Sequence, residues 1–173
     1  VVDGKEVMLD DGTPLKYEPL AVEQNLTASK YIETAGARMK KYEVDRTAYA
    51  DGRLPNNDIV LYRYADVLLM KAEALVRNGE SGDEPFNAVR RRVGMAEKAA
   101  TLDNILDERL LELAWEGWRR QDLIRFGRFT QAYDLHTPSQ LDAKQASIVF
   151  PIPQKAIDLN GGLIQNPEYE TKK

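Results

Sequence analysis

The sequence contains no cysteine and a single histidine, His136, among its 173 residues. Without cysteine the chain forms no disulfide, no thiolate zinc site and no cysteine nucleophile. His136 stands beside Thr137 and Pro138 in a weakly patterned segment, outside the Glu-x-x-His step that a carboxylate-bridged metal pair would need. We therefore expect neither a metal nor a cofactor.

An excess of positive charge and long apolar runs are missing as well. The formal net charge is -4 and the pI is about 5.2, whereas nucleic-acid binding requires a basic excess on one face. The longest apolar run, Val67–Met70, is far short of the roughly 20 residues that cross a bilayer. Neither a glycine-rich phosphate loop nor a nucleophile elbow occurs. We expect no nucleic-acid partner and no membrane-spanning segment.

The chain has the composition of a soluble globular domain, with 43% apolar and 30% charged residues. Turn signals at 10–12 and 13–14 and a helix-breaking glycine at 36 predict loops with short strands in residues 1–58. Residues 38–44 are predicted to be an extended segment that touches a helical core. A helical region then follows over residues 59–170, and we expect it to form a single domain with the first segment.

Three helices are predicted from apolar residues that recur at steps of three and four. They cover 59–78, 85–94 and 101–128, and the third, with Thr101 as N-cap and a break near Gly117, is expected to be the longest. Stop signals are Gly79 and Gly94. The predicted core stripes consist of Val60, Tyr64, Val67, Leu68, Ala72 and Leu75 on the first helix, and of Leu102, Ile105, Leu106, Leu110, Leu113 and Ala114 on the third.

The remainder reads as a surface connection and a proline-containing tail. A short helix is expected within 140–145. Residues 149–153 are predicted to be extended because each proline disfavours a helical conformation in the residue before it. Pro153 then starts a short helix through Ile157, which 160–162 ends. We expect this tail to pack back on the helices.

The first two helices resemble one tetratricopeptide-like hairpin. Such units bury their faces fully only when neighbours stack on them, and the sequence supplies one hairpin. Residues 1–5 do not form a signal peptide and do not begin with Met. These features predict a piece of a longer protein.

Three motifs in this order resemble the C-terminal region of the SusD/RagB family. They are RYADVLLMKAEA at 63–74 with FNAVRRRVG at 86–94, ERLLELAWEGWRRQDLIR at 108–125, and PIPQ at 151–154 followed by QNPEY at 165–169. The resemblance covers roughly residues 37–170, while residues 1–36 match no pattern of the family.

The resemblance implies an all-α, tetratricopeptide-like protein that binds nutrients, usually glycans such as starch, and catalyses no reaction. It implies a SusC-like TonB-dependent transporter as partner. It also implies lipid anchoring at the outward face of the outer membrane, through a segment outside this sequence. The ligand itself and the oligomeric state do not follow from the resemblance.

A row of glutamates marks the central motif. Glu108, Glu112 and Glu116 stand four residues apart, on one face of a helix, where like charges repel unless cations lie between them. Arginines at matching steps favour structural ion pairing over catalysis, because a glycosidase needs two carboxyls facing across a cleft. The residues assigned to this structural motif are Glu108, Arg109, Glu112, Glu116, Arg119, Asp122 and Arg125.

Aromatic side chains are the remaining candidates, because sugar rings stack on them. Trp115 and Trp118 lie on the third predicted helix, where packing or an interface is the favoured interpretation. The candidates for glycan contact are Trp115, Trp118, Tyr17, Tyr31 and Tyr49. Two other functions stay open: a stand-alone tetratricopeptide-like interaction module, and a small hydrolase that uses the glutamate row.

Overall fold

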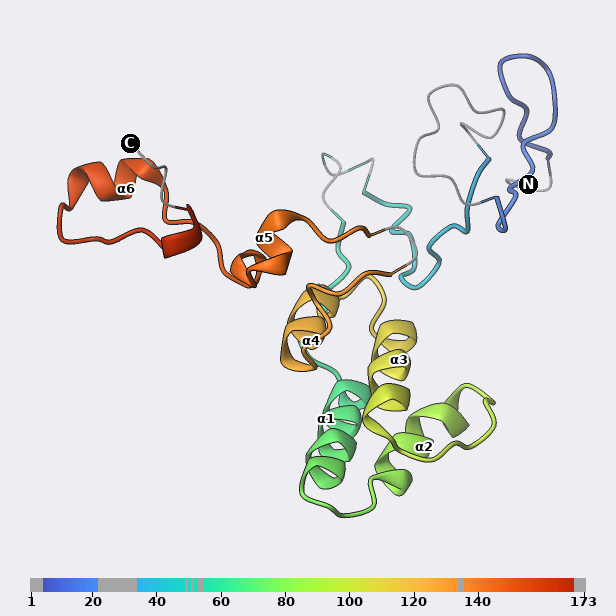
Figure 1. Cartoon of the computed structure of the whole chain (residues 1–173). Helices are drawn as coiled ribbons and strands as arrows, with labels where there is room; N and C mark the ends of the chain where they lie inside the picture. Colours follow the sequence, from blue (N-terminus) through green and yellow to red (C-terminus); the bar gives the residue numbers. More distant parts are fainter. Residues whose placement is uncertain are drawn as a thin grey trace. The chain divides into compact units, whose positions relative to one another are not determined.

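The computed structural model describes residues 5–21, 34–48, 50, 52, 55–133 and 136–169. The chain divides into two compact units, Val1–Asp58 and Ile59–Lys173. Figure 1 follows the chain through both units from blue to red.

The second unit is helical. Its elements are α1 (Tyr64–Arg77), α2 (Asp83–Arg92), α3 (Leu102–Glu112), α4 (Arg119–Arg125), α5 (Gln140–Ala143), α6 (Gln154–Leu159) and two short 3₁₀ helices, η1 (Ala146–Ile148) and η2 (Pro167–Tyr169). Across the described ranges no β-strand forms, and extended pairing is limited to isolated bridges. The protein is all-α, as predicted.

The described part of the first unit consists of loops and turns, so the prediction of short strands there is wrong. The turn at Gly12 brings Met8 and Pro14 together in a single antiparallel bridge. Leu9 N donates to Thr13 O and Leu15 N donates to Val7 O. Thr13 N donates to the side chain of Asp11 at 2.8 Å and not back to Leu9, and the pairing stays a single bridge.

Helix α1 begins later than predicted and turns a different face to the core. Residues 59–62 precede it, and Arg63, in an extended conformation, is its N-cap. Tyr64 and Val67, two members of the predicted stripe, are exposed. The buried positions are Ala65, Asp66, Leu69, Ala72 and Glu73. The predicted stripe is shifted because two buried carboxylates interrupt the apolar pattern.

Helices α1 and α2 form the predicted hairpin, and the chain leaves α1 through Gly79 at a positive φ of 79°. Pro85 is in the first turn of α2, where its missing N–H costs no hydrogen bond. At the start of α2, a Cβ on Gly82 would lie 2.6 Å from the backbone oxygen of Ala72. The two helices therefore meet through backbone at this position.

The third predicted helix is two helices, and it is not the longest. Thr101 caps α3 by accepting a hydrogen bond from Asn104 N at 3.1 Å, as predicted. The helix ends at Glu112, and α3 has 11 residues against 14 in α1. Positive φ angles at Trp115 (68°) and Gly117 (81°) take the chain from α3 into α4, since left-handed residues do not continue a helix.

A small core lies among α1, α2 and α3, and α1 packs on both of the other helices (Figure 1). Leu69, Phe86 and Ile105 are fully buried, and Val89 is almost so. Phe126, next to the end of α4, is partly buried against this core. Asn87 of α2 ties down the connection to α3 by hydrogen bonds with the backbone N and O of Lys98. Leu110 was predicted to belong to the core stripe of the third helix, but its side chain is exposed.

The tail contains the two short helices that the sequence predicts. Ser139 and Asp142 form a capping box at the start of α5, and Pro153 is the N-cap of α6. Arg120 of α4 donates to Ser147 O and Ile148 O, just before the proline-containing tail. Helix α6 buries none of its residues, so the prediction that the tail packs back on the helices is wrong for α6. No helix in the described part of the chain has the length and apolar content needed to cross a membrane.

Candidate functional site

Arg109 of α3 is the centre of a buried ionic cluster that joins three helices. Its Nη1 donates to Asp66 Oδ1 of α1 at 2.7 Å, and its Nε lies 2.9 Å from Asp122 Oδ2 of α4 without the alignment of a hydrogen bond. The side chain of Arg109 is 2% exposed and those of the two aspartates are 1% exposed. We call Asp66, Arg109 and Asp122 the Arg109 cluster.

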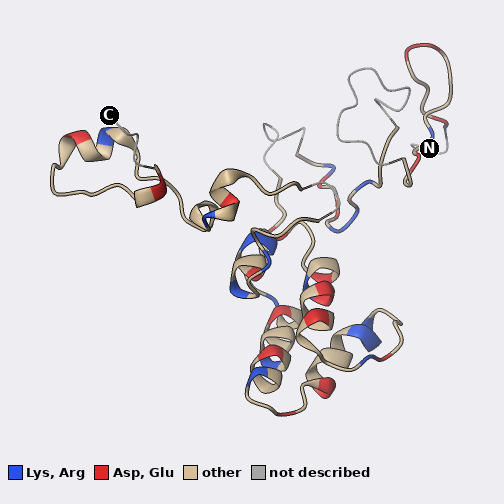
Figure 2. Ribbon diagram, viewed as in Figure 1, with Lys and Arg blue, Asp and Glu red and all other residues tan. Residues whose placement is uncertain are grey.

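The glutamate row meets arginines from outside α3. Figure 2 shows the charges distributed over these helices. Glu108 pairs with Arg90 of α2, and Glu112 accepts from Arg63 and, at 2.7 Å, from Arg92. The carboxylate of Glu116 accepts from Arg63 Nε at 2.9 Å. The sequence predicted cations from neighbouring turns, but those that pair with the row come from α2 and from the segment before α1.

The other motif residues also make contacts over long distances in the sequence. Arg119 Nη1 donates to Leu106 O at 2.9 Å. Arg125 binds both oxygens of Glu73 at 2.9 Å and Asp122 Oδ1 at 2.8 Å. Burial opposes ionisation of Glu73, but hydrogen bonds from Arg125 and Arg77 outweigh it and lower the pKa of that carboxyl.

This arrangement suits the holding of helices better than acid and base chemistry. A catalytic acid must stay protonated near neutral pH, whereas guanidinium partners favour the charged carboxylate. Among the residues that the structure describes, no group of three metal-binding side chains is placed to hold an ion.

The two tryptophans line one surface pocket at the turn between α3 and α4. The pocket has a volume of about 360 Å³. Trp115 is 77% exposed, and the partly buried Trp118 has its ring centroid 5.3 Å from that of Tyr62, at an interplanar angle of 47°. We call this the tryptophan pocket. Sequence reasoning missed Tyr62, which lies before α1 and outside any helical repeat.

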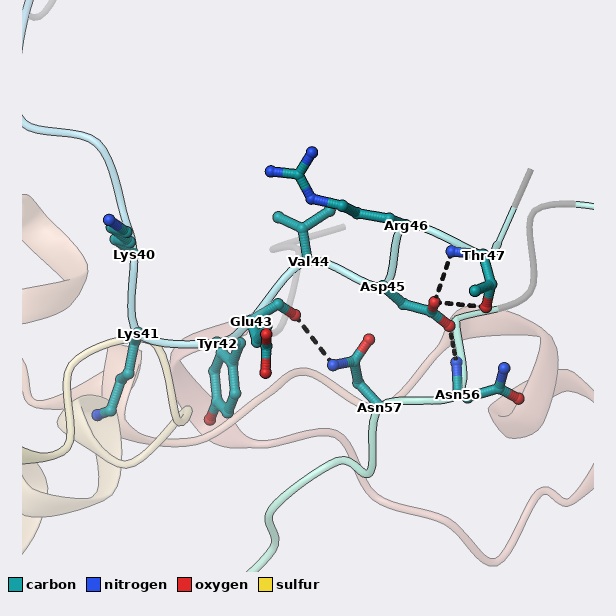
Figure 3. A pocket seen from close by; sticks show the side chains of 10 residues that line it. All are labelled: Lys40, Lys41, Tyr42, Glu43, Val44, Asp45, Arg46, Thr47, Asn56 and Asn57. Carbon is teal, nitrogen blue, oxygen red and sulfur yellow. Dashed lines mark hydrogen bonds between the residues drawn. The ribbon is translucent and has the colours of Figure 1, made fainter. Parts of the chain in front are cut away.

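A second pocket, of about 900 Å³, lies in the loops of the first unit (Figure 3). Asp45 holds it together, because its carboxylate accepts from Thr47 N at 2.8 Å, from Thr47 Oγ1 at 2.7 Å and from Asn56 N at 2.7 Å. The Asn57 side chain donates to Glu43 O at 2.9 Å. The lining is mainly polar: Lys40, Lys41, Tyr42, Glu43, Val44, Asp45, Arg46, Thr47, Asn56 and Asn57.

The Asp45 carboxyl is expected to titrate far below an ordinary aspartate. Hydrogen bonds from Asn56 N and from Thr47 lower its pKa to about 2, against about 3.9 for a free side chain. The contribution of Asp45 to folding stability is complete at a pH above its pKa in the unfolded chain. This contribution is lost as the pH falls through its lower pKa in the folded chain. Carbon-13 NMR of the carboxyl should give a midpoint near 2, and Thr47→Val should raise it. A midpoint near 4 in the unmodified protein would contradict this structure of the loop.

Of the tyrosine candidates in the first unit, the structure describes Tyr17. Tyr17 is half exposed, and the guanidinium carbon of Arg38 lies 4.4 Å from the centre of its ring, a distance at which cation–π attraction is significant. Tyr31 and Tyr49 fall outside the described residues. Tyr17 is not among the residues that line the loop pocket.

The second unit is thus all-α, with a helix hairpin, cross-helix ion pairs and a short proline-bounded tail. Residues 20–169 match the model of the SusD family. The chain belongs to this family.

Several relatives are similar to this chain. The starch-binding protein SusD of Bacteroides thetaiotaomicron is 31% identical over 140 residues, and a SusD-like protein of Formosa agariphila is 33% identical over 132. The alignments cover 77% and 67% of this chain and 25% of each relative. The chain thus spans about a quarter of the length of these relatives.

The fold is similar to that of a solved relative. Surface glycan-binding protein A from Bacteroides thetaiotaomicron superposes with a TM-score of 0.56 and 36% identity, over 65% of this chain and 25% of that one. The same protein in complex with laminarihexaose gives a TM-score of 0.55 and 37% identity, over 64% of this chain and 25% of that one.

Proposed function

We propose that the protein is the glycan-binding component of an outer-membrane nutrient uptake system and that it catalyses no reaction. The observation that carries the proposal is the match to the SusD family over residues 20–169. Support comes from a relative named for starch binding and from another solved with laminarihexaose. Because the chain spans a quarter of these relatives, the proposal concerns the whole protein to which it belongs.

The partner we propose is a SusC-like TonB-dependent transporter, with the protein lipid-anchored at the outward face of the outer membrane. Family membership supports both statements. Affinity purification of the tagged full-length protein from detergent-solubilised outer membranes tests them. A TonB-dependent barrel should co-purify in near-equal amounts, and recovery of the protein from the soluble fraction alone would contradict them.

The tryptophan pocket is our first candidate for glycan contact. Aromatic rings offer flat apolar faces to the C–H faces of sugars, and neighbouring polar groups bind hydroxyls. Trp115 and Trp118 supply such rings, and Arg119 and Arg120 line the same pocket. Tyr62 packs against Trp118 from outside the lining.

The binding test uses the full-length protein on an array of neutral and acidic oligosaccharides, followed by calorimetry with the best ligand. We expect saturable binding and no change in the length of the glycan after prolonged incubation. Absence of binding to every glycan would contradict the proposed function. Release of shorter products would favour a hydrolase instead.

Replacing Glu112 by glutamine tests the hydrolase alternative directly. The substitution removes the negative charge of the carboxylate that accepts hydrogen bonds from Arg63 and Arg92. It keeps the shape of the side chain. Because both arginines keep some exposure to solvent, we expect a loss of about 1–3 kcal/mol in unfolding free energy with glycan affinity unchanged. A loss of hydrolytic activity at unchanged stability would support the hydrolase.

A stand-alone tetratricopeptide-like module is the other alternative. Such modules stack several hairpins, whereas the described residues contain the single hairpin α1–α2. Binding of a protein ligand in the absence of any glycan binding would favour the module.

A further inference from the structure

We infer that a pocket between α3, α4 and the loop after α4 binds one neutral sugar ring of a glycan, with Tyr133 as its stacking platform. The pocket has a volume of about 560 Å³, within the range of roughly 300–1,000 Å³ of small-ligand sites. Leu106, Leu110 and Leu123 give it an aliphatic lining, and Tyr133 adds an aromatic ring. This inference rests on the proposed function, because it takes the ligand to be a glycan.

The ring of Tyr133 is supported from one side and open on the other. His136 stacks on it with the centroids 4.9 Å apart and the planes 25° from parallel. Backbone hydrogen bonds in both directions between Tyr133 and His136, at 3.2 and 2.8 Å, fix the two residues as a pair. Since His136 covers one face and the side chain is still 58% exposed, the second face is free to stack on a sugar.

A chain of contacts holds this platform in place. His136 Nε2 lies 3.5 Å from Asp142 Oδ2. Asp142 is buried and is itself fixed by the capping box with Ser139 at the start of α5. The platform is therefore attached to a helix end rather than carried by an unsupported loop, which reduces the entropy lost when a ligand binds.

The polar groups of the pocket suit hydroxyls. Arg128 Nη2 donates to Asp103 Oδ1 at 3.0 Å and its Nη1 donates to Gln131 Oε1 at 3.2 Å. Asp107 also lines the pocket and is exposed. Carboxylate, guanidinium and amide groups present paired donors or acceptors on planar side chains, which match two adjacent hydroxyls of a sugar.

The charges favour a neutral glycan over an acidic one. Asp103 and Asp107 contribute two negative charges, and Arg119 and Arg128 contribute two positive charges, so the lining has no formal net charge. Arg119 is in addition engaged with Leu106 O. A uronate or sulfate group would find no surplus of positive charge here, and Asp107 would repel it.

The position of the pocket supports a glycan of several rings. Leu110 and Arg119 line both this pocket and the tryptophan pocket, so the two pockets share a wall on α3 and α4. A single oligosaccharide laid over that wall would place one ring on Tyr133 and another near Trp118. A chain of several rings should therefore gain from both pockets, whereas a disaccharide should gain from one.

The experiment compares full-length variants by calorimetry with the hexasaccharide and the disaccharide of the best neutral glycan found on the array. Tyr133→Ala should weaken binding of the hexasaccharide about tenfold, as expected for loss of an aromatic anchor. Tyr133→Phe keeps the ring and should bind as the parent protein does. Tyr64→Ala removes an exposed tyrosine of α1 that does not line the pocket, and it should leave affinity unchanged.

Asp107→Ala provides a second variant that does not touch the platform, and a loss of at least threefold is expected from removal of a charged acceptor. Thermal unfolding of each variant checks that the fold persists. If neutral glycans bind and neither Tyr133→Ala nor Asp107→Ala weakens them, this inference is wrong while the proposed function stands. Binding of acidic glycans alone also overturns it, and binding of no glycan overturns both.

Discussion

Replacing Arg109 by methionine is expected to lower the unfolding free energy by about 3–5 kcal/mol. The substitution leaves two aspartates, each 1% exposed, without the guanidinium that faces both of them. Asp122 keeps Arg125 as a partner at 2.8 Å, so the larger cost arises at Asp66. Urea denaturation of the full-length protein, followed by circular dichroism at 222 nm, measures the change.

A triple variant and a surface control test whether uncompensated charge is the cause. The triple variant adds Asp66→Asn and Asp122→Asn to Arg109→Met, which removes both negative charges and should recover part of the lost unfolding free energy. Arg128→Ala breaks the exposed pair with Asp103, whose side chains are 47% and 78% exposed, and should cost less than about 1 kcal/mol. Equal losses for Arg109→Met and Arg128→Ala would show that burial of the Arg109 cluster is not its energetic basis.

Replacing Phe86 by alanine should lower the unfolding free energy by about 3–5 kcal/mol as well. Phe86 is fully buried among the residues of α1, α2 and α3 that form the core. The helices are held together by backbone contact at Gly82 and by ion pairs, so they cannot close fully around the space left by the ring. The same denaturation experiment gives the value.

Leu159→Ala is the matched control for Phe86→Ala. Leu159 ends α6 and is highly exposed, so a change within about 0.5 kcal/mol is expected. A loss below about 1 kcal/mol for Phe86→Ala would mean that the α1–α2 hairpin is not packed on α3 as the structure has it.

Local signals in the sequence predicted the helix boundaries well where the chain itself supplies the stop or the cap. Thr101 caps α3, Gly79 ends the α1 turn, and Pro153 precedes α6. These features depend on the conformational preferences of one residue and its nearest neighbours. They are therefore visible without any knowledge of tertiary contacts.

Burial of charge is what the apolar pattern could not predict. On α1, Asp66 and Glu73 take positions that a hydrophobic stripe would leave to apolar residues, and the predicted stripe consequently shifted toward Tyr64 and Val67. Arg109 is 43 residues from Asp66, and Arg125 is 52 residues from Glu73, although Glu73 also pairs with Arg77 four residues away. Periodicity carries no information about partners at such separations.

Some aromatic residues of the pockets could be predicted from the sequence, and others could not. The two tryptophans were singled out from their chemistry, and the structure brings both to one pocket, with Tyr62 packed against Trp118. Tyr133 gave no signal, because it lies in a segment without apolar periodicity and owes its setting to His136, α3 and α4. The contribution of a residue like this becomes visible only once the helices are placed.

The contact at Gly82 sets a rule for building chimeras within this family. Since any Cβ there would meet the backbone of Ala72 at 2.6 Å, the separation of the hairpin is fixed by main-chain atoms and not by the choice of side chains around it. A hairpin grafted from a relative therefore needs glycine at this position, in addition to side chains that fill the core shared with α3. A graft with alanine there would have to open the hairpin, and it would displace the arginines of α2 from the glutamates that they bind.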